Sequence, residues 1–491
     1  MRFIIAIDLG TTHIKAVIVN HQAKPLQTFK LPVVSVQNES GKYGQDAETI
    51  FQSVLILLKQ SLEVVSQEDV ACIVFSAAMH SILAVDKAGI PLCISLTWAD
   101  TQSKAYAQQL KSTPAGESIY KQTGTPIHAM SPLCKIAWIK DEQPELFAKT
   151  HKFISVKEYI FHRLFGKYIV DVGIASASGL FDIYNLCWYK EALEFSGIDE
   201  SKLSQVVSAT HFETALLESI KSELNLKHSI PFVTGGNDGC LANLGCSALN
   251  KDEAALTVGT SGAVRVTISK PLPAALQGLF RYMLTNELYV TGGPINNGGI
   301  ALQWFAENFL GIALSASEDL NTIMQLASKA PAGSNGLLFL PYLLGERAPV
   351  WDEDAKGMFY GLQLIHRKEH LTRAVIEGIS FSLLQILTAI EKVNGNVNKV
   401  FVSGIVTQSE WWMQLLANMF GKTIVLTESA DASAMGAAFV GMYATGMIDD
   451  LSTVKSFMQI TKTFEPDANI HAIYQKHFEV YVSLYPRFKQ K

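Results

Sequence analysis

The sequence predicts an α/β protein of two large domains that face each other across a central cleft. A chain of 491 residues is too long to fold around a single hydrophobic core. Stretches typical of strands alternate with stretches typical of helices, which favours an α/β architecture. A strand, a Gly-Thr-hydroxyl turn and a second strand occur twice, at residues 5–19 and 255–268. Because the two copies lie about half a chain length apart, they indicate two related halves.

Composition and charge describe an ordinary globular protein. Hydrophobic residues make up 48% of the chain and charged residues 17%, and a net charge of −5 gives no reason to expect nucleic acid or an anionic membrane as a partner. Six cysteines without a C-x-x-C pair favour reduced cytosolic thiols over a zinc site. The longest uncharged apolar run, residues 70–85, is too short to span a bilayer, and no cleavable apolar segment opens the chain. We therefore expect a cytoplasmic protein.

The first half predicts strands that end in polar loops. Residues 3–35 suggest a three-stranded meander with turns at residues 10–12 and 21–25, and Asp46 opens an amphipathic helix pattern that extends to Val65. The remaining expectations are a strand at 71–75, a hairpin at 83–95, a loop at 124–128, a helix at 133–141 opened by Ser131 and Pro132, a strand end and helix at 152–166, and a polar loop at 171–178.

The middle of the chain predicts a buried strand at residues 232–234, followed by a glycine turn that delivers Asp238 to the start of a helix. We expect the domain boundary at residues 249–253, which divides the chain into domains of residues 1–249 and 250–491. The second half predicts helices at 300–309, 369–392 and 410–420, a strand at 399–402, and a small-residue helix at 432–444 packed closely on a neighbour.

These local patterns have structural as well as functional explanations. A Gly-Thr turn between strands is commonly a plain hairpin, and an aspartate such as Asp238 at a helix start is commonly an N-cap. The functional explanation is that N–H groups and hydroxyls of the two turns hold a polyphosphate from both sides, with the Asp238 carboxylate between them. The same choice between structure and function applies to His80, Trp98, Asp100 and His128.

Two long segments resemble the signatures of a known family. Residues 130–142 and 357–362, the latter followed by His370, Leu371 and residues 374–377, resemble those of the FGGY carbohydrate kinases, within the actin/hexokinase/heat-shock ATPase superfamily. The resemblance covers nearly the whole chain. It implies a two-domain actin/hexokinase-like (ribonuclease H-like) fold that binds ATP and Mg²⁺ in its cleft.

The resemblance also assigns roles to residues at matching positions. Asp238 would accept the proton of the sugar hydroxyl, and Asp8 would hold Mg²⁺ through water, with Asp238 assigned to the metal as well. Phosphoryl transfer needs such a proton acceptor, in-line positioning and neutralisation of charge. The residues assigned to the nucleotide are Gly10, Thr11, Thr12 and Lys15 in the first phosphate loop, Gly259, Thr260 and Ser261 in the second, and Ser403, Gly404 and Ser409 around the nucleoside.

In this family, loops of the first domain select the sugar. Their residues here resemble most closely those of the gluconate kinases, with xylulose kinases as the alternative, so a sugar acid phosphorylated at its terminal hydroxyl is the expected substrate. Its carboxylate would need a cation or several N–H donors, from His80, His128 or Arg347. A non-catalytic ATP-binding sensor is the rival from a different class, and a homodimer is a possible assembly. The residues assigned to the sugar are Met79, His80, Trp98, Asp100, His128, Met130, Asp171 and Arg347.

One position departs from the family pattern. The nucleoside loop usually carries a second glycine where this chain has Ile405. A side chain there could crowd the ribose or the α-phosphate, since glycine permits close approach. The alternative is a tolerated change with the nucleotide shifted slightly. The departure concerns nucleotide affinity more than catalysis.

Overall fold

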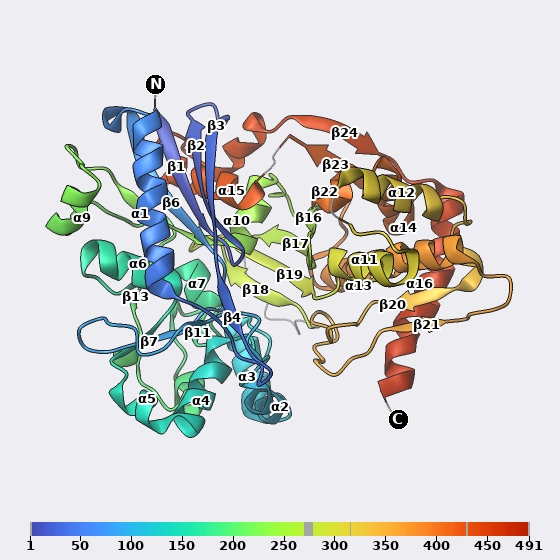
Figure 1. Ribbon diagram of the computed structural model, residues 1–491, viewed down its shortest axis with the longest axis horizontal. Helices are drawn as coiled ribbons and strands as arrows, with labels where there is room; N and C mark the ends of the chain where they lie inside the picture. Colours follow the sequence, from blue (N-terminus) through green and yellow to red (C-terminus); the bar gives the residue numbers. More distant parts are fainter. Residues whose placement is uncertain (1, 270–277, 315, 429–430, 490–491) are drawn as a thin grey trace.

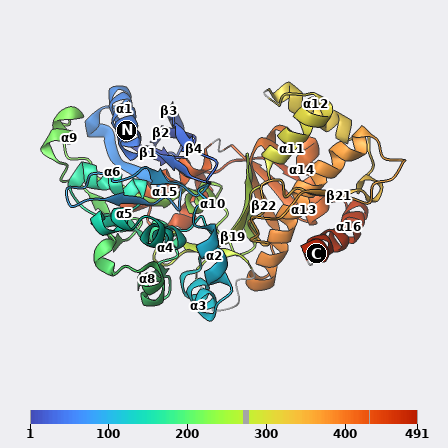
Figure 2. The same ribbon diagram turned by 60° about the horizontal axis from the view of Figure 1, so that its bottom comes forward.

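The structure is a computed structural model that describes residues 2–269, 278–314, 316–428 and 431–489. Two large mixed β-sheets form the centres of two lobes that lie side by side (Figures 1 and 2). The N-terminal end lies on one lobe and the C-terminal end on the other.

The first half builds a six-stranded sheet with the order β14 (Phe212–Glu213), β15 (Phe232–Asn237), β6 (Val70–Ala77), β1 (Phe3–Leu9), β2 (His13–Asn20) and β3 (Pro25–Pro32). Strands β1 to β3 form the predicted antiparallel meander, and β1, β6 and β15 run parallel to one another. These three strands therefore end at the same edge of the sheet, where Gly10, Ala78 and Asp238 follow them directly. Ligands bind at such edges in α/β sheets.

The second half builds a seven-stranded sheet with the order β18 (Phe280–Met283), β19 (Tyr289–Ile295), β17 (Gly262–Ile268), β16 (Glu253–Val258), β22 (Lys399–Gly404), β23 (Thr423–Thr427) and β24 (Ile460–Phe464). Strand β16 pairs antiparallel with β17 and parallel with β22, as β1 pairs with β2 and β6. The two halves thus share one strand arrangement, in agreement with the repeat in the sequence.

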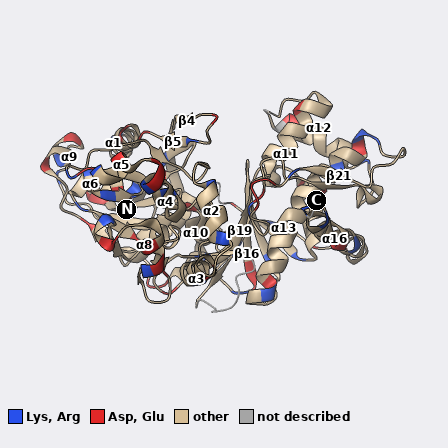
Figure 3. Ribbon diagram, turned by 90° about the horizontal axis from the view of Figure 1, so that it is seen from below, with Lys and Arg blue, Asp and Glu red and all other residues tan. Residues whose placement is uncertain are grey.

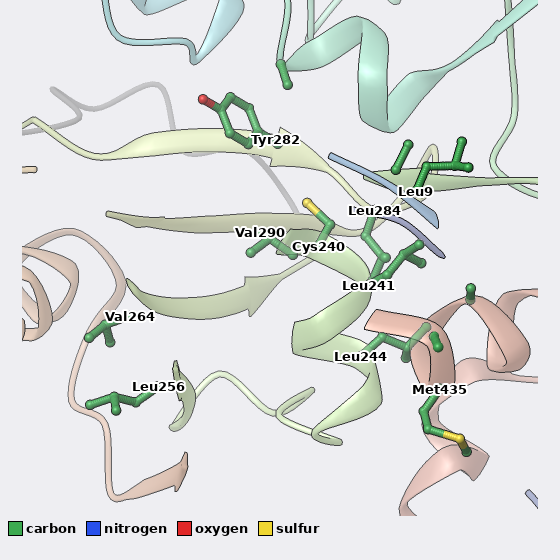
Figure 4. Packing of buried hydrophobic residues seen from close by; sticks show 14 of the residues in the cluster. Leu9, Cys240, Leu241, Leu244, Leu256, Val264, Tyr282, Leu284, Val290 and Met435 are labelled. Carbon is green, nitrogen blue, oxygen red and sulfur yellow. The ribbon is translucent and has the colours of Figure 1, made fainter. Parts of the chain in front are cut away.

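Two helices connect the lobes. Helix α10 (Asp238–Gly245) follows β15 and contacts strands of both sheets, and α15 (Ala432–Ala444), from the far end of the chain, packs against α10, β1 and β6. Figure 4 shows Leu244 of α10 directed toward α15. A Cβ atom on Gly436 would lie 1.9 Å from the carbonyl oxygen of Leu241, so the helices can approach this closely only because residue 436 is glycine.

Further helices and short strands surround the two sheets. The other helices of the first half are α1 (Ala47–Val64), α2 (Lys104–Lys111), α3 (Pro114–Thr123), α4 (Pro132–Glu142), α5 (Pro144–Lys149), α6 (Val156–Phe165), α7 (Val172–Ser176), α8 (Lys190–Ser196) and α9 (Glu218–Glu223). Those of the second half are α11 (Gly299–Phe305), α12 (Ser317–Ala327), α13 (Lys368–Asn394), α14 (Glu410–Phe420) and α16 (Ala468–Lys489). The short strands are β4 (Ser35–Gln37), β5 (Tyr43–Gln45) and β8 (Ser95–Leu96) in one sheet, and the pairs β7 (Leu83–Val85) with β9 (Lys152–Ile154), β10 (Ile169–Asp171) with β13 (Gln205–Val207), β11 (Phe181–Asp182) with β12 (Cys187–Trp188), and β20 (Leu338–Leu340) with β21 (Met358–Tyr360).

One local prediction is wrong, although most predicted elements are present. Residues 171–178 do not form a loop, because the Asp171 carboxylate accepts a hydrogen bond from the Ile174 amide and caps α7. The predicted hairpin at residues 83–95 is present as a turn, in which the Asp86 amide donates to the Ile90 carbonyl and the Leu92 amide to the Ala84 carbonyl. Bridges join Val85 to Pro91 and Ile82 to Leu96, and β7 also pairs with the distant β9.

Charge and hydropathy agree with a globular molecule. Acidic and basic residues are interspersed along both lobes (Figure 3). Within the described residues, α13 is the one helix long and apolar enough to cross a membrane, but 78% of its most apolar window is buried inside the protein. Its apolar character is that of a core helix in the second lobe.

Candidate active site

A cavity of about 280 Å³ lies between the two halves and gathers many of the predicted site residues. The predicted residues that line it are Thr11, Met79, His80, Trp98, Met130, Asp238, Gly259, Ser261 and Arg347. Thr257, Arg265, Phe280 and Tyr282, which the sequence analysis did not assign, line it as well.

Asp238 reaches this cavity because of the turn that precedes it. Gly235 has φ +63°, and a Cβ atom there would lie 1.8 Å from the Phe75 carbonyl oxygen, so the turn requires glycine. The Asn237 side chain caps α10 by accepting from the Cys240 amide at 2.8 Å. Asp238 is therefore the first helical residue and not the N-cap. Burial, with a contribution from Asp8, raises the pKa of Asp238 to about 6 against the opposing charge of Arg265.

Asp8, the residue before the last one of β1, has one carboxylate oxygen without a hydrogen bond. Its Oδ2 accepts a hydrogen bond of 2.9 Å from Ser433 Oγ, whereas its buried Oδ1 has no hydrogen-bond partner among the described residues. Burial raises the pKa of Asp8. The described residues contain no cluster of three or more His, Cys, Asp or Glu side chains that could hold a metal. A cation bound here would therefore depend on Asp8, Asp238 and oxygens of a ligand or water.

The start of helix α15, from the last part of the chain, contacts Asp8 and Lys15 on either side of the first turn. Lys15 Nζ lies 2.6 Å from Oδ2 of Asp431, the residue before α15, and Ser433 bonds Asp8 as described above. The sequence analysis missed Asp431 and Ser433, since nothing in their local pattern relates them to a site more than 400 residues away.

The two predicted phosphate loops are held by backbone contacts that leave their tips accessible. Gln45 Nε2 donates to the Thr11 carbonyl at 2.7 Å, and the Gly299 amide donates to the Gly259 carbonyl at 2.7 Å. Thr12 and Thr260 are exposed. Backbone donors and hydroxyls on fixed turns of this kind can receive phosphate oxygens.

The predicted nucleoside loop lies beside the second phosphate loop. Ser403 Oγ is 3.0 Å from Thr257 Oγ1, and Gly404 has φ +90°, where a Cβ atom would lie 2.1 Å from the Val258 carbonyl oxygen. Ser409 Oγ accepts from the Trp412 amide and caps α14. Ile405 is partly buried against the core.

One buried lysine holds the predicted sugar loops together. Lys135 on α4 is 0% exposed, and its Nζ donates to the carbonyls of His80, Thr97 and Met130 at 2.8, 2.6 and 2.8 Å. Burial lowers its pKa to about 7, against the attraction of Asp100. Lys135 lies inside the family signature, yet its positioning role could not be inferred from the sequence.

Both candidate histidines are neutral. His80 Nδ1 donates to the Ala177 carbonyl at 2.7 Å, and burial lowers its pKa well below the usual range, which leaves Nε2 as an acceptor. His128 Nδ1 accepts from the Met130 amide, so its Nε2 carries the proton and faces Glu353 at 3.2 Å. Burial lowers the pKa of His128 to about 3. His128 lines a different cavity, of about 810 Å³.

Asp100 and Asp171 also lie outside the smaller cavity. Asp100 is 1% exposed and accepts hydrogen bonds from the amides of Tyr43 and Gln102. Asp171 pairs with the buried Lys157 at 2.5 Å, and Lys157 donates to the Thr234 and Gly236 carbonyls. The structure thus places Asp171 behind the turn that carries Asp238 and outside the lining of the smaller cavity.

Two arginines bring positive charge into the cavity. The Arg347 guanidinium lies 5.2 Å from the centre of the Trp98 ring and donates to the Ile295 carbonyl at 3.0 Å. Arg265 lies on β17, and the sequence analysis missed it. The available signal was a charged residue inside an otherwise apolar strand, residues 262–268.

Comparisons with known proteins cover almost the entire chain. Models for the N-terminal and C-terminal domains of the FGGY family of carbohydrate kinases match residues 3–245 and 254–445. The chain is 37% identical to a gluconokinase of Bacillus subtilis (strain 168) over 488 residues, which is 98% of this chain and 95% of that protein. Crystal structures of a gluconate kinase and of a ligand-bound xylulose kinase, both from Lactobacillus acidophilus, each match with a TM-score of 0.94 and 32% identity over 99% of this chain, and over 99% and 100% of those chains respectively. The predicted two-domain actin/hexokinase-like fold is confirmed.

Proposed function

Because the chain belongs to the FGGY family of carbohydrate kinases, we propose that it transfers the γ-phosphoryl group of ATP to the terminal hydroxyl of D-gluconate, giving 6-phospho-D-gluconate. The family establishes a phosphotransferase with ATP as donor and a carbohydrate as acceptor. Similarity to the B. subtilis gluconokinase supports gluconate as that acceptor. The observation that carries the choice is the Arg347 guanidinium, held over Trp98 in the cavity that contains Asp238.

Asp238 is the proposed general base. With a pKa raised to about 6, its carboxylate is ionised at neutral pH and still basic enough to accept a proton. The terminal hydroxyl oxygen of gluconate attacks the γ-phosphorus while its proton passes to Asp238. The bond between the γ-phosphorus and the oxygen of the ADP leaving group breaks in the same transfer.

Mg²⁺ is the proposed metal cofactor, and the residues present fit it. Asp8 Oδ1 is buried without a hydrogen-bond partner in the described part of the chain, and Asp8 contributes to the raised pKa of Asp238. Mg²⁺ prefers oxygen ligands and keeps several waters, so Asp8 and Asp238 would hold it directly or through water, together with phosphate oxygens. When bound, the ion neutralises negative charge on the phosphates.

The proposed phosphate loops come from opposite halves of the chain. Gly10, Thr11 and Thr12, with Lys15, would hold the phosphates from one side, and Gly259, Thr260 and Ser261 from the other. We further propose that Ser403, Gly404 and the start of α14 at Ser409 receive the nucleoside, because Ser403 adjoins Thr257 behind the second loop. Approach of the halves would then exclude water that could otherwise be phosphorylated.

The alternative substrate is xylulose. The xylulose kinase of L. acidophilus matches this chain with the same TM-score and identity as the gluconate kinase. A neutral sugar, however, would bring no negative charge to the guanidinium of Arg347, whose acidic neighbour is the buried Glu346. A non-catalytic ATP-binding sensor would need neither Asp238 nor a sugar cavity.

We also propose that the enzyme acts in the cytoplasm on a free sugar acid, without nucleic acid or membrane as a partner. The interspersed charges and the buried position of α13 support this proposal. A homodimer stays a prediction, as does the domain boundary at residues 249–253.

A coupled assay of ADP release tests the proposed function. The panel consists of D-gluconate, D-xylulose, D-ribulose, glycerol and L-fuculose. We expect kcat/KM for gluconate to exceed that for xylulose by at least about a hundredfold, since charge-assisted hydrogen bonds discriminate strongly. A higher kcat/KM for xylulose would reject gluconate and leave the carbohydrate kinase assignment intact.

A further inference from the structure

Among the charged side chains that line the small cavity, positive charges outnumber negative charges. They are one carboxylate, Asp238, and two guanidiniums, Arg265 and Arg347. The neighbouring His80 is neutral and adds no charge. Among the side chains that line the cavity, positive charges therefore outnumber negative charges by one, which favours an anionic group on the ligand; the buried Glu346 neighbours Arg347 outside this lining.

We propose that Arg265 and Arg347 together form the subsite that binds the carboxylate of the sugar acid, an inference that rests on the proposed function. From the sequence alone, His80, His128 and Arg347 are the candidates for this role. Both histidines are neutral, and His128 lines another cavity. Of those three, only Arg347 is a cation, and Arg265 is a second one that no sequence signature indicated.

The fold makes room for Arg265 at this position. Arg265 on β17 pairs with Gly292 on β19, and Gly292 pairs on its other side with Phe280 of β18. A Cβ atom on Gly292 would lie 3.0 Å from Arg265 Cγ, so a larger residue would displace the arginine. Arg265 Nε lies 3.4 Å from the position that a Cβ atom of Gly239 would occupy, at the start of α10. The side chain thus extends from the second sheet toward the helix that carries Asp238.

Both guanidinium groups have N–H donors without a hydrogen-bond partner among the described residues. Arg265 Nε and Nη1 and Arg347 Nε are buried and have no hydrogen-bond partner among the described residues. In the same part of the chain, no ion pair within 4.0 Å involves either arginine. Unpaired buried donors of a charged group are costly, and a carboxylate accepts N–H donors in the fork geometry that arginine offers. A bound carboxylate would satisfy these donors and neutralise the excess charge.

An alternative role for Arg265 is to stabilise only the Asp238 carboxylate or the phosphoryl group in transfer. Its charge does oppose the rise in the pKa of Asp238. The two roles differ in what they affect. A carboxylate partner affects binding of acids and spares neutral sugars, whereas a partner of the base or the phosphoryl group affects turnover of every sugar alike.

The test compares Arg265→Met and Arg265→Lys with the wild type. A matched control is Arg281→Met, which removes a buried arginine on β18 whose guanidinium bonds Thr291 and Tyr184 and does not line the cavity. Calorimetry with a non-hydrolysable ATP analogue present measures binding of D-gluconate, D-xylulose and D-glucitol, the neutral hexitol that matches gluconate in length. Thermal unfolding verifies that each variant is folded.

We expect Arg265→Met to weaken gluconate binding by about 10- to 150-fold and to change binding of the neutral ligands by less than about threefold. Arg265→Lys, which keeps the charge and loses the fork, should retain part of the preference for the acid.

An equal loss for acid and neutral ligands, an equal loss in Arg281→Met, or a fall in kcat with gluconate affinity intact would each overturn the assignment. If Arg265→Met does not fold, Arg265→Lys provides the test through its ratio of gluconate affinity to glucitol affinity. A ratio equal to that of the wild type would count against a bidentate contact between Arg265 and the carboxylate. A wild type that binds gluconate no better than glucitol would instead reject the proposed function, so the two failures are distinguishable.

Discussion

Lys15 and Asp431 form an ion pair with 2.6 Å between Nζ and Oδ2, although 416 residues separate them in the sequence. The pair joins the strand after the proposed first phosphate loop to the start of α15. Because Ser433 of the same helix bonds Asp8, the end of the chain supports both the loop and the proposed metal ligand. The first lobe is therefore completed by a helix from the last part of the sequence.

The first prediction concerns this pair. Asp431→Asn removes the charge that faces Lys15 and should lower the free energy of unfolding by about 1 kcal/mol, as expected for a partly exposed pair. The KM for ATP should rise, because Lys15 then loses its fixed position beside the phosphate loop. Urea titration and steady-state kinetics measure the two effects. Glu223→Gln breaks the more exposed pair with Lys59 and serves as the control, with no change in the KM for ATP. Equal effects of both variants would refute a specific role for Asp431.

The second prediction concerns the base. Asp238→Asn should lower kcat by at least about 100-fold, since the amide cannot accept the proton of the hydroxyl. Gluconate binding by calorimetry should stay within about tenfold, because the amide can still hydrogen-bond that hydroxyl. A folded variant with nearly normal kcat would remove Asp238 from the mechanism.

The third prediction is a pH dependence. Asp238 must be ionised to act as base, so kcat/KM should fall as the pH decreases through about 6. In Arg265→Met this acid limb should move to higher pH, because the guanidinium opposes the rise in the pKa of Asp238. The pH profile of kcat/KM for a neutral sugar measures both effects, and an acid limb unchanged by the substitution would contradict the coupling.

The same group has an effect on stability with a defined sign. The folded pKa of Asp238 is raised from 3.8 to about 6, so the folded state binds more protons than the unfolded state between these values. The contribution of Asp238 to the free energy of unfolding is therefore fully present below pH 3.8 and is lost as the pH rises through about 6. Denaturant titrations of the wild type and Asp238→Asn across this range should converge at the acidic end and diverge at neutral pH.

The fourth prediction concerns Lys135. Lys135→Met leaves three buried carbonyls without their donor and should lower the free energy of unfolding by about 3 kcal/mol or more. The KM for sugar should rise while the KM for ATP stays constant, because the three carbonyls belong to the sugar loops. Lys140→Met on the same helix removes a partly exposed lysine and is the control. A change in the KM for ATP as large as that for sugar would show a general loss of structure.

The fifth prediction concerns Ile405. Its side chain packs against the core, so Ile405→Gly should loosen the nucleoside loop, raise the KM for ATP and leave the KM for sugar unchanged. Ile405→Ala removes the side chain without the added backbone freedom and should have the smaller effect. A lower KM for ATP in both variants would show instead that the isoleucine crowds the nucleotide.

Sequence reasoning placed the site because the features that define it are local. The meander, the turn at Gly10 and the helix start at Asp238 follow from short patterns of apolar residues and glycines, and each is where the sequence predicted it. Parallel strands then bring their ends to one edge, so residues at strand ends could be grouped before any contact was known. The partners of individual side chains did not follow from such patterns, and the loop predicted at residues 171–178 was wrong for that reason.

By itself, the sequence determined the two related halves, the position of Asp8 near the end of a strand and of Asp238 at the start of a helix, and the family to which the chain belongs. Only the tertiary structure decided that Asp431 meets Lys15, that Lys135 bonds the carbonyls of three loop residues, and that Arg265 lines the cavity. The physical reason is the distance over which each kind of interaction acts. Apolar periodicity and turn chemistry act over a few residues, whereas hydrogen bonds and ion pairs act over a few ångströms between segments that only the folded backbone brings together.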